Sequence, residues 1–469
     1  MLVFCLSLPS PPVFREEILP MDKTYLKWYN KVGYGSGDIA GNVVYALLSS
    51  FVMIYLTDTV GLNSAVVGTL MLASKLFDGV SDIFFGSMID KTRTRMGKAR
   101  PWMFWGYFGC AASLVAVFAI PSSLGKSAQY AWFFIAYTLL NAVFYTANNI
   151  AYSALTALIT KNGGERVQMG SIRFIFAFAT SMLIQAVTVG VVRALGGGAD
   201  GWRAAAIIYA LIGLAVNSLS VFSVKELPPE EFSESASAPE EKYSLAETLK
   251  TLVKNRYYLI ICCVYILTQL YTATLNMGLY FMTYALLNEN LLGVFSVAIN
   301  IPLICGLLLT PMLVQRLRGM YKLNLAGYVL AALSRALVIV AAYLGSVPLM
   351  LLFSAVASFG MSPLQGDLNA LIASCSEYTF LTQKKRMDGT MYSCTSLGVK
   401  IGGGVGVALV GWLLDASGYV PGAPVQAQSC IKMLYFIYLW LPMLMNLLIA
   451  FLLSKLKVEQ ANLNLQSKV

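Results

Sequence analysis

The stretch SKLFDGVSDIFFGSMIDKTRTRMGKARPW, residues 74–102, decides the fold of this chain. Its first half is apolar but carries Lys75, Asp78 and Asp82, and spacings of three and four residues place them on one helix face. A charge at the centre of a membrane span costs about 2.5–3.5 kcal/mol, so three charges on one face need a shared role. A salt bridge between Lys75 and Asp78 would join helices but leave the second carboxylate unpaired. We therefore favour an ion or substrate pathway over a purely structural pair.

The composition is that of a polytopic membrane protein. The 469 residues are 58% hydrophobic and 12% charged, whereas soluble proteins carry about 25% charged residues. We interpret the net charge of +10 as loop charge that sets topology, not as affinity for nucleic acid. The absence of histidine excludes His-based metal sites, triads and proton relays, and the eight scattered cysteines are typical of free buried thiols. No catalytic constellation is present, so we expect neither an enzyme nor a cofactor.

Twelve apolar stretches approach the length of about 20 residues that a membrane span needs. They lie at residues 38–57, 65–89, 102–120, 130–159, 172–195, 203–224, 257–286, 291–315, 322–344, 348–375, 391–414 and 431–455. Connectors after even-numbered spans are basic, as in residues 91–100, and those after odd-numbered spans are short and nearly neutral. The positive-inside rule then predicts that both termini are cytoplasmic, in a bacterial-type inner (plasma) membrane.

The first 20 residues stand apart from this pattern. Arg15-Glu16-Glu17 resembles a translated ribosome-binding site, and Met21 follows it closely. We therefore expect translation to start at Met21 and residues 1–20 to be a non-native extension.

The longest polar segment divides the chain into two equal sets of spans. Residues 225–256 are rich in Pro, Ser and Glu, and predict a cytoplasmic linker that ends in a short amphipathic helix. Six spans precede it in residues 21–224, six follow in residues 257–455, and residues 456–469 form a polar cytoplasmic tail. This all-α layout of two six-helix bundles resembles the major facilitator superfamily, whose substrates bind near the midplane between the halves.

Polar side chains share one face of span four. Tyr145, Asn149 and Tyr152 offer amide, hydroxyl and aromatic groups that suit hydrogen bonding and stacking with a sugar. Polar contacts between helices would explain the same pattern, and both readings stay open.

Other charges lie deeper in the spans or near their ends. Asp367 of span ten and Lys400 of span eleven lie in adjacent spans, and we hypothesise that they pair. Arg173 opens span five, where it is either a loop charge or a site residue. Asp38 and Asp415 lie near span ends and are interpreted as solvated or capping residues.

Several separated motifs, in order, carry a family resemblance. They are YGSGD at 34–38, YLTDTVGLN at 55–63, KLFDGVSDIFFGSMIDKTRTRMGKARPW at 75–102, NNIAYSAL at 148–155, KKRMDGTMYS at 384–393, LGVKIGGGVG at 397–406 and GYVPG at 418–422. With them the chain resembles the glycoside–pentoside–hexuronide:cation symporters, the family of melibiose permease, over nearly its whole length.

The resemblance implies a cation site on spans two and four. Asp78 and Asp82 match the paired acidic positions that bind the coupling cation, and Thr146 matches the threonine of the same site. Ser81 stands where an asparagine lies near that site, and Lys75 matches a basic position beside the pair, in a charge network that we extend to Asp367. The expected coupling ion is Na⁺, with H⁺ and Li⁺ as alternatives.

The implied sugar site is only partly retained. Arg173 and Lys400 match basic positions of that site. Asn42 and Asn149 stand where melibiose permease has two carboxylates, and Ser153 and Gln365 stand where it has two tryptophans that flank the sugar. Together with Tyr145 and Tyr152, these residues are the predicted substrate site. Replacing carboxylates by amides makes the cavity less negative, which suits either a neutral glycoside or oligosaccharide or an anionic hexuronide.

We therefore expect a secondary transporter that couples sugar uptake to a monovalent cation by alternating access. It would act in the bilayer as a monomer. A lysolipid or drug carrier on the same fold is one alternative. A non-transporting membrane sugar sensor is another, although it would need a signalling domain and the longest loop is only residues 225–256.

Overall fold

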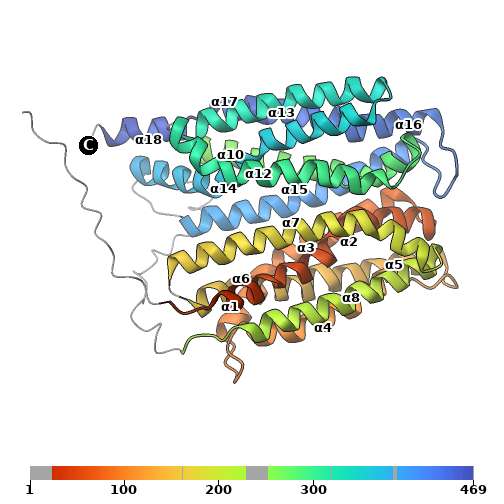
Figure 1. Cartoon of the computed structure of the whole chain (residues 1–469), viewed down its shortest axis with the longest axis horizontal. Helices are drawn as coiled ribbons and strands as arrows, with labels where there is room; N and C mark the ends of the chain where they lie inside the picture. Colours follow the sequence, from red (N-terminus) through yellow and green to blue (C-terminus); the bar gives the residue numbers. More distant parts are fainter. Residues whose placement is uncertain (1–23, 161, 229–251, 318, 384–387, 468–469) are drawn as a thin grey trace, which may run out of the picture.

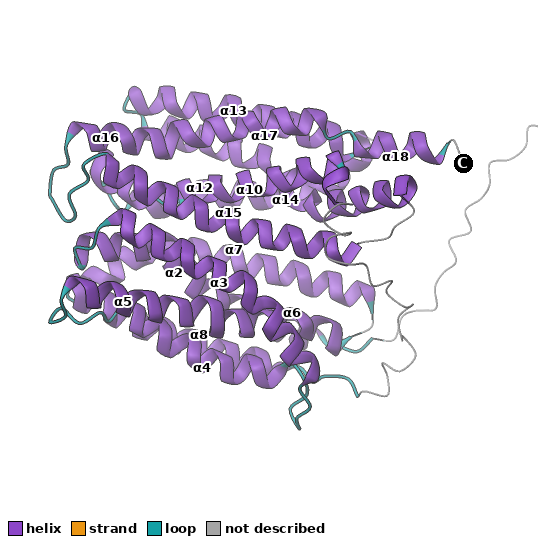
Figure 2. Cartoon of the chain, turned by 180° about the vertical axis from the view of Figure 1, so that it is seen from behind, coloured by secondary structure: helices purple, strands orange, loops and turns teal. Residues whose placement is uncertain are grey.

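A computed structural model of the chain describes residues 24–467 apart from 161, 229–251, 318 and 384–387. Regular structure in these residues is helical, with one isolated bridge between Thr94 and Gly97. Figure 2 shows the helices running side by side with loops at both ends of the bundle. The predicted extension 1–20 and most of the predicted linker, including the start of its amphipathic helix, lie outside the described residues.

The first half of the chain contains the first six predicted spans. Its elements are α1 (Trp28–Gly35), α2 (Gly37–Ile54), η1 (Tyr55–Thr59), α3 (Ser64–Lys91), α4 (Arg100–Val117), α5 (Lys126–Thr138), η2 (Leu139–Tyr145), α6 (Thr146–Ile159), α7 (Gly163–Ala194) and α8 (Gly198–Ser223). The η elements are π-helical segments that continue spans one and four, so α2 with η1, and α5 with η2 and α6, each form one span.

The second half contains the other six. Its elements are α10 (Arg256–Leu275), α11 (Gly278–Tyr280), η4 (Phe281–Ala285), α12 (Leu291–Leu317), α13 (Met320–Tyr343), α14 (Val347–Gln383), α15 (Asp388–Ala416), α16 (Gln428–Tyr435), η5 (Phe436–Trp440), α17 (Leu441–Lys455) and α18 (Val458–Gln466). Figure 1 shows this half stacked on the first, with the described start of the chain and α18 at the same end of the molecule. We call this the terminal end and the opposite one the far end.

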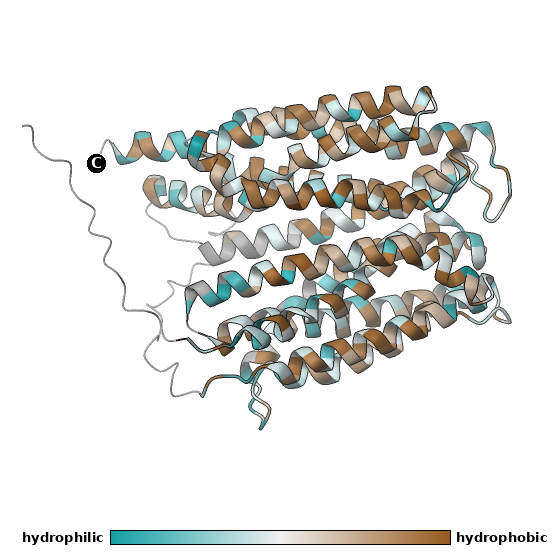
Figure 3. Ribbon diagram, viewed as in Figure 1, coloured by the Kyte–Doolittle hydropathy of each residue, from teal (hydrophilic) through white to brown (hydrophobic). Residues whose placement is uncertain are grey.

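Hydropathy agrees with a membrane protein. Ten helical segments of the described chain are long and apolar enough to cross a bilayer. The two other predicted spans are α3, which carries the charges of the opening stretch, and α4. Figure 3 shows hydrophobic residues along the helices and hydrophilic ones gathered toward their ends.

Glycines allow α15 to pack closely on one helix of each half. A Cβ at Gly404 would lie 2.9 Å from Leu72 and 3.0 Å from the Cβ of Lys75 on α3, and one at Gly406 would lie 2.7 Å from Ala273 on α10. Gly404 and Gly406 therefore allow α15 to pack closely on α3 of the first half and on α10 of the second.

The two halves are joined at the far end by a cluster around one carboxylate. Asp58 of η1 accepts hydrogen bonds from the hydroxyls of Tyr284 and Tyr419 in the second half. Beside it, the hydroxyls of Thr57 and Tyr280 are 2.7 Å apart. We call Asp58, Tyr284 and Tyr419 the far-end latch.

Further contacts across the halves also lie at the far end. Asn63 donates to Asp415, Ser64 donates to the Gly411 carbonyl at 3.1 Å, and Arg193 pairs with Glu289. Asp415 is exposed, as its interpretation as a solvated residue predicted, and it also accepts a hydrogen bond across the halves. Between described residues, the hydrogen bonds and ion pairs that join the halves lie either at this end or at Lys400 near the midplane.

Candidate functional site

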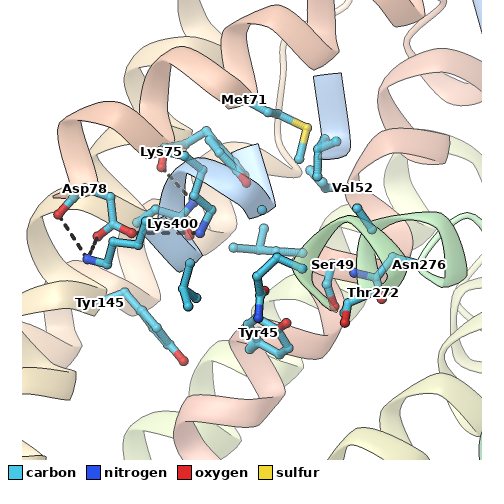
Figure 4. Close-up of a pocket in the computed structure, with 18 of the residues that line it drawn as sticks. Tyr45, Ser49, Val52, Met71, Lys75, Asp78, Tyr145, Thr272, Asn276 and Lys400 are labelled. Carbon is cyan, nitrogen blue, oxygen red and sulfur yellow. Dashed lines mark hydrogen bonds and ion pairs between the residues drawn. The ribbon is translucent and has the colours of Figure 1, made fainter. Parts of the chain in front are cut away.

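A cavity of about 510 Å³ lies between the halves near the midplane. Figure 4 shows a charged cluster on one side of it and Tyr45, Ser49, Thr272 and Asn276 on the other. The lining comes from spans one, two and four of the first half and spans seven and eleven of the second. A polar cavity at this depth is the arrangement expected of a transporter built from two helical bundles.

The charged cluster is centred on Lys400. Its Nζ lies 3.1 Å from a carboxylate oxygen of Asp78 and 2.5 Å from one of Asp82, and donates to the Asp78 carbonyl at 3.1 Å. Lys75 Nζ lies 3.9 Å from the other Asp78 oxygen, and the Thr146 hydroxyl donates to Asp78. The three predicted charges of span two and the predicted threonine of span four therefore meet, and the cluster is neutral.

The Lys400 ammonium lies among oxygen atoms of two aspartates. It is surrounded by two carboxylate oxygens and one carbonyl oxygen, which are the hard oxygen ligands that an alkali cation prefers. Asp78 is buried and Asp82 is half-buried, so Asp82 is the ligand more open to the cavity. A cation can use this oxygen set only if the ammonium moves away.

Two predicted members of this network lie elsewhere. Asp367 accepts a hydrogen bond from Asn324 at 3.3 Å, so the hypothesis that it pairs with Lys400 is wrong for this structure. The Ser81 hydroxyl donates to the Asp78 carbonyl at 2.9 Å instead of pointing at a carboxylate, and Ser81 does not line the cavity.

The predicted substrate residues separate into groups. Tyr145, Asn149 and Lys400 line the cavity. Asn42 does not, because its amide donates to the Asp38 carbonyl at 2.8 Å. Ser153 is exposed on α6 and lines neither this cavity nor the second one described below.

Arg173 belongs to a separate cluster nearer the terminal end. Its Nε lies 2.6 Å from Asp38, and its guanidinium lies 4.1 Å from the centre of the Tyr152 ring. The Tyr152 hydroxyl donates to the same Asp38 oxygen at 2.9 Å. Neither Arg173 nor Tyr152 lines the cavity, and the interpretation of Asp38 as a solvated or capping residue is wrong.

A second cavity of about 240 Å³ adjoins the first. The two share Tyr45, Ser49, Thr272 and Asn276, and Gln365 lines the second. Its other polar lining residues are Ser50, Ser181, Gln185, Tyr271, Ser296, Asn300, Ser358 and Tyr438, all uncharged. Together the cavities offer a cluster of charges at one end and neutral hydrogen-bonding groups at the other.

The sequence analysis missed the contribution of span seven. Gln269, Thr272 and Asn276 all line the first cavity, and spacings of three and four residues place them on one helix face. In span one, Tyr45 and Ser49 likewise continue the face begun by Asn42. Both polar stripes were readable in the sequence by the periodicity used for spans two and four.

A family model described as MFS/sugar transport protein matches residues 33–460. The chain belongs to this family. The family and the relatives described below are transporters and not enzymes. The predicted family resemblance and the predicted fold are therefore confirmed. As a member of the MFS sugar-transport family, the chain is a polytopic membrane protein.

Relatives of this MFS protein cover most of its length. The isoprimeverose transporter of Lactiplantibacillus pentosus is 27% identical over 90% of this chain and 86% of its own. The glucuronide carrier protein homolog of Escherichia coli (strain K12) is 27% identical over 84% of this chain and 85% of its own. The solved structure of a D-xylose-proton symporter superposes with a TM-score of 0.62 at 17% identity, over 92% of this chain and 98% of that one, which shows the common fold.

Proposed function

We propose that this transporter couples the uptake of a sugar to Na⁺, which binds at Asp78, Asp82 and Thr146. The observation that carries the proposal is the position of Lys400, whose ammonium bridges both carboxylates inside the cavity between the halves. The two carboxylates already bind a cationic side chain of the protein itself. A cation from solution can compete with that side chain for the same oxygen atoms.

The competition supplies a coupling mechanism. Lys400 belongs to α15 in the second half, and both carboxylates belong to α3 in the first. When Na⁺ takes the carboxylate oxygens, the ammonium is released and the midplane ion pairs between the halves are broken. A sugar that binds to the same cavity then meets a different arrangement of charges, so each ligand changes the affinity for the other by the same factor.

The cavities favour a sugar over a lipid as the cargo. Hydroxyl and amide side chains line both of them, and these groups match the hydroxyls of a glycoside. The relatives named as an isoprimeverose transporter and a glucuronide carrier homolog support a glycoside, either neutral or acidic.

Orientation belongs to the same proposal. With the terminal end in the cytoplasm of a bacterial cell, the far-end latch would close the outer side of the transporter, which we propose to act as a monomer. Protease cleavage of a tag at the C-terminus in inverted membrane vesicles, but not in right-side-out ones, is the expected result. The reverse pattern would contradict this orientation.

Transport assays test the function. The purified protein is reconstituted in proteoliposomes, and the uptake of neutral glycosides and uronides is measured. Each sugar is tested separately under an inward gradient of Na⁺, of Li⁺ and of H⁺. We expect uphill accumulation of a sugar only with Na⁺. Accumulation that follows the proton gradient alone would reject Na⁺ coupling, and the absence of transport for every sugar would reject the cargo.

A further inference from the structure

Arg335 in the middle of α13 is a buried charge that the mechanism above does not use. Its side chain is 1% exposed, and its Nη2 donates to the hydroxyl of Tyr271 on α10, with the guanidinium 5.3 Å from the centre of that ring. Its Nε has no hydrogen-bond partner among the described residues. No described carboxylate forms an ion pair with it, although an unpaired charge inside a membrane protein is strongly unfavourable.

Asp367, another buried charge of the second half, is held elsewhere. Asp367 is hydrogen-bonded to Asn324 at 3.3 Å. Asn324 lies eleven residues from Arg335 on the same helix, which corresponds to about 16 Å along the axis. The positive charge of Arg335 is therefore uncompensated by the described residues around it.

Arg335 acts on the second cavity through Tyr271. Tyr271 lines that cavity, and because its hydroxyl oxygen accepts from Arg335, its own proton is free to be donated. None of the residues that the structure describes accepts a hydrogen bond from this hydroxyl. Ser358 lines the same cavity, and its buried hydroxyl also has no partner among the described residues. The wall thus presents one available hydroxyl donor, on Tyr271, with a positive charge behind it.

The charge balance of the joined cavities points the same way. Lys75, Lys400 and Arg335 are cationic, and Asp78 and Asp82 are anionic, which leaves one positive charge. Without a bound cation, an anionic group in the second cavity would balance that charge, whereas a neutral sugar would leave it unbalanced. A bound Na⁺ would add a further positive charge and would favour an anionic sugar more strongly.

We propose that the second cavity is the subsite for the carboxylate of an acidic glycoside. Tyr271 donates its hydroxyl proton to the carboxylate, and Arg335 is a positioning residue that fixes this hydroxyl and supplies the balancing charge. This assignment rests on the proposed function as a sugar transporter, and narrows its substrate class to glycosides with one negative charge.

A matched pair of ligands tests the subsite. p-Nitrophenyl β-D-glucoside and p-nitrophenyl β-D-glucuronide differ only in a hydroxymethyl group against a carboxylate. We measure the binding of each to the full-length protein in nanodiscs by calorimetry. Wild type should bind the glucuronide at least about tenfold more tightly, because only the carboxylate balances the buried charge.

Two variants each remove one member of the Tyr271–Arg335 pair, a third keeps the positive charge, and a fourth is a control outside the pair. Tyr271→Phe keeps the ring and loses only the hydroxyl, and should reduce the preference for the glucuronide several-fold, with a much smaller loss of glucoside binding. Arg335→Gln should do the same, and Arg335→Lys should retain part of the preference. Tyr328→Phe is the control, because Tyr328 is a buried tyrosine of α13 that lines neither cavity. It should keep the wild-type preference.

The outcomes separate this inference from the proposed function. A wild type that binds the glucoside as tightly as the glucuronide, or a Tyr271→Phe variant with an unchanged preference, overturns the subsite and leaves sugar transport intact. Equal loss of both ligands in Tyr271→Phe also overturns it, since that result assigns the pair a structural role. If Arg335→Gln does not fold, Tyr271→Phe decides. The transport panel above tests the proposed function independently.

Discussion

At the scale of single residues, Asp78 and Asp82 have different surroundings although they face the same ammonium. Asp78 is buried and also accepts from Thr146, whereas Asp82 is half-buried and bonds mainly to Lys400. Asp78 is therefore held by contacts to two other helices, whereas Asp82 is held by Lys400.

Asp82→Asn should abolish uphill accumulation of sugar while leaving exchange of sugar across the membrane. The amide keeps the size of the side chain but removes the charge that attracts the coupling cation. Accumulation and counterflow measured in the same proteoliposomes distinguish the two activities. Accumulation at the wild-type level would contradict the assigned role of Asp82.

Lys400→Gln should raise the affinity for Na⁺ by about tenfold or more, because a site released from an internal competitor is available for a larger fraction of the time. Calorimetric titration of the wild type and the variant with NaCl measures the change. Weaker or unchanged Na⁺ binding would show that the lysine does not compete with the cation.

At the scale of helices, the position of Lys400 depends on how closely α15 packs on α3. Gly404 faces Leu72 and Lys75 at distances that leave no room for a side chain. Gly398, on the same helix, has open space around its Cβ position. Helix α15 therefore contains both a position that needs glycine and one that does not.

Gly404→Ala should lower the thermal stability, with a cost of about 1–3 kcal/mol that is typical of overpacking, and should weaken Na⁺ coupling by moving Lys400 away from α3. Gly398→Ala is the matched control, and should be neutral or stabilising because alanine favours the helix by about 1 kcal/mol. Thermal melting in detergent measures both. Equal effects of the two variants would refute the packing argument.

At the scale of the whole molecule, the two halves are held together at the midplane by Lys400 and at the far end by the latch of Asp58, Tyr284 and Tyr419. The latch is built from one carboxylate of the first half and two phenols of the second. Alternating access requires that such contacts break when the far end opens.

Asp58→Ala should shift the protein toward the state that is open at the far end, since it removes two hydrogen bonds to a carboxylate, each worth about 1.5–3 kcal/mol. Electron–electron distance measurements between spin labels on the far ends of the two halves should show the longer distance more populated than in wild type. Asp200→Ala removes an exposed ion pair within the first half and is the control. An unchanged distance distribution in Asp58→Ala would reject the latch.

Much of the fold and part of the site follow from local sequence. The twelve spans come from apolar length, and the common face of Lys75, Asp78 and Asp82 comes from the helical period. Both properties depend on neighbours within a few residues, which the sequence displays directly. The same periodicity would have revealed Gln269, Thr272 and Asn276 in span seven.

Only the tertiary structure decided which charges meet. Lys400 pairs with a carboxylate 322 residues away and not with Asp367 of the adjacent span, and Arg173 pairs with Asp38 outside the cavity. It also showed that Arg335 has no described counter-ion beside the second cavity. Helix packing sets these distances, and no local pattern encodes it. The sequence therefore determined the helices and their polar faces, and the packing of the two halves determined which side chains those faces contact.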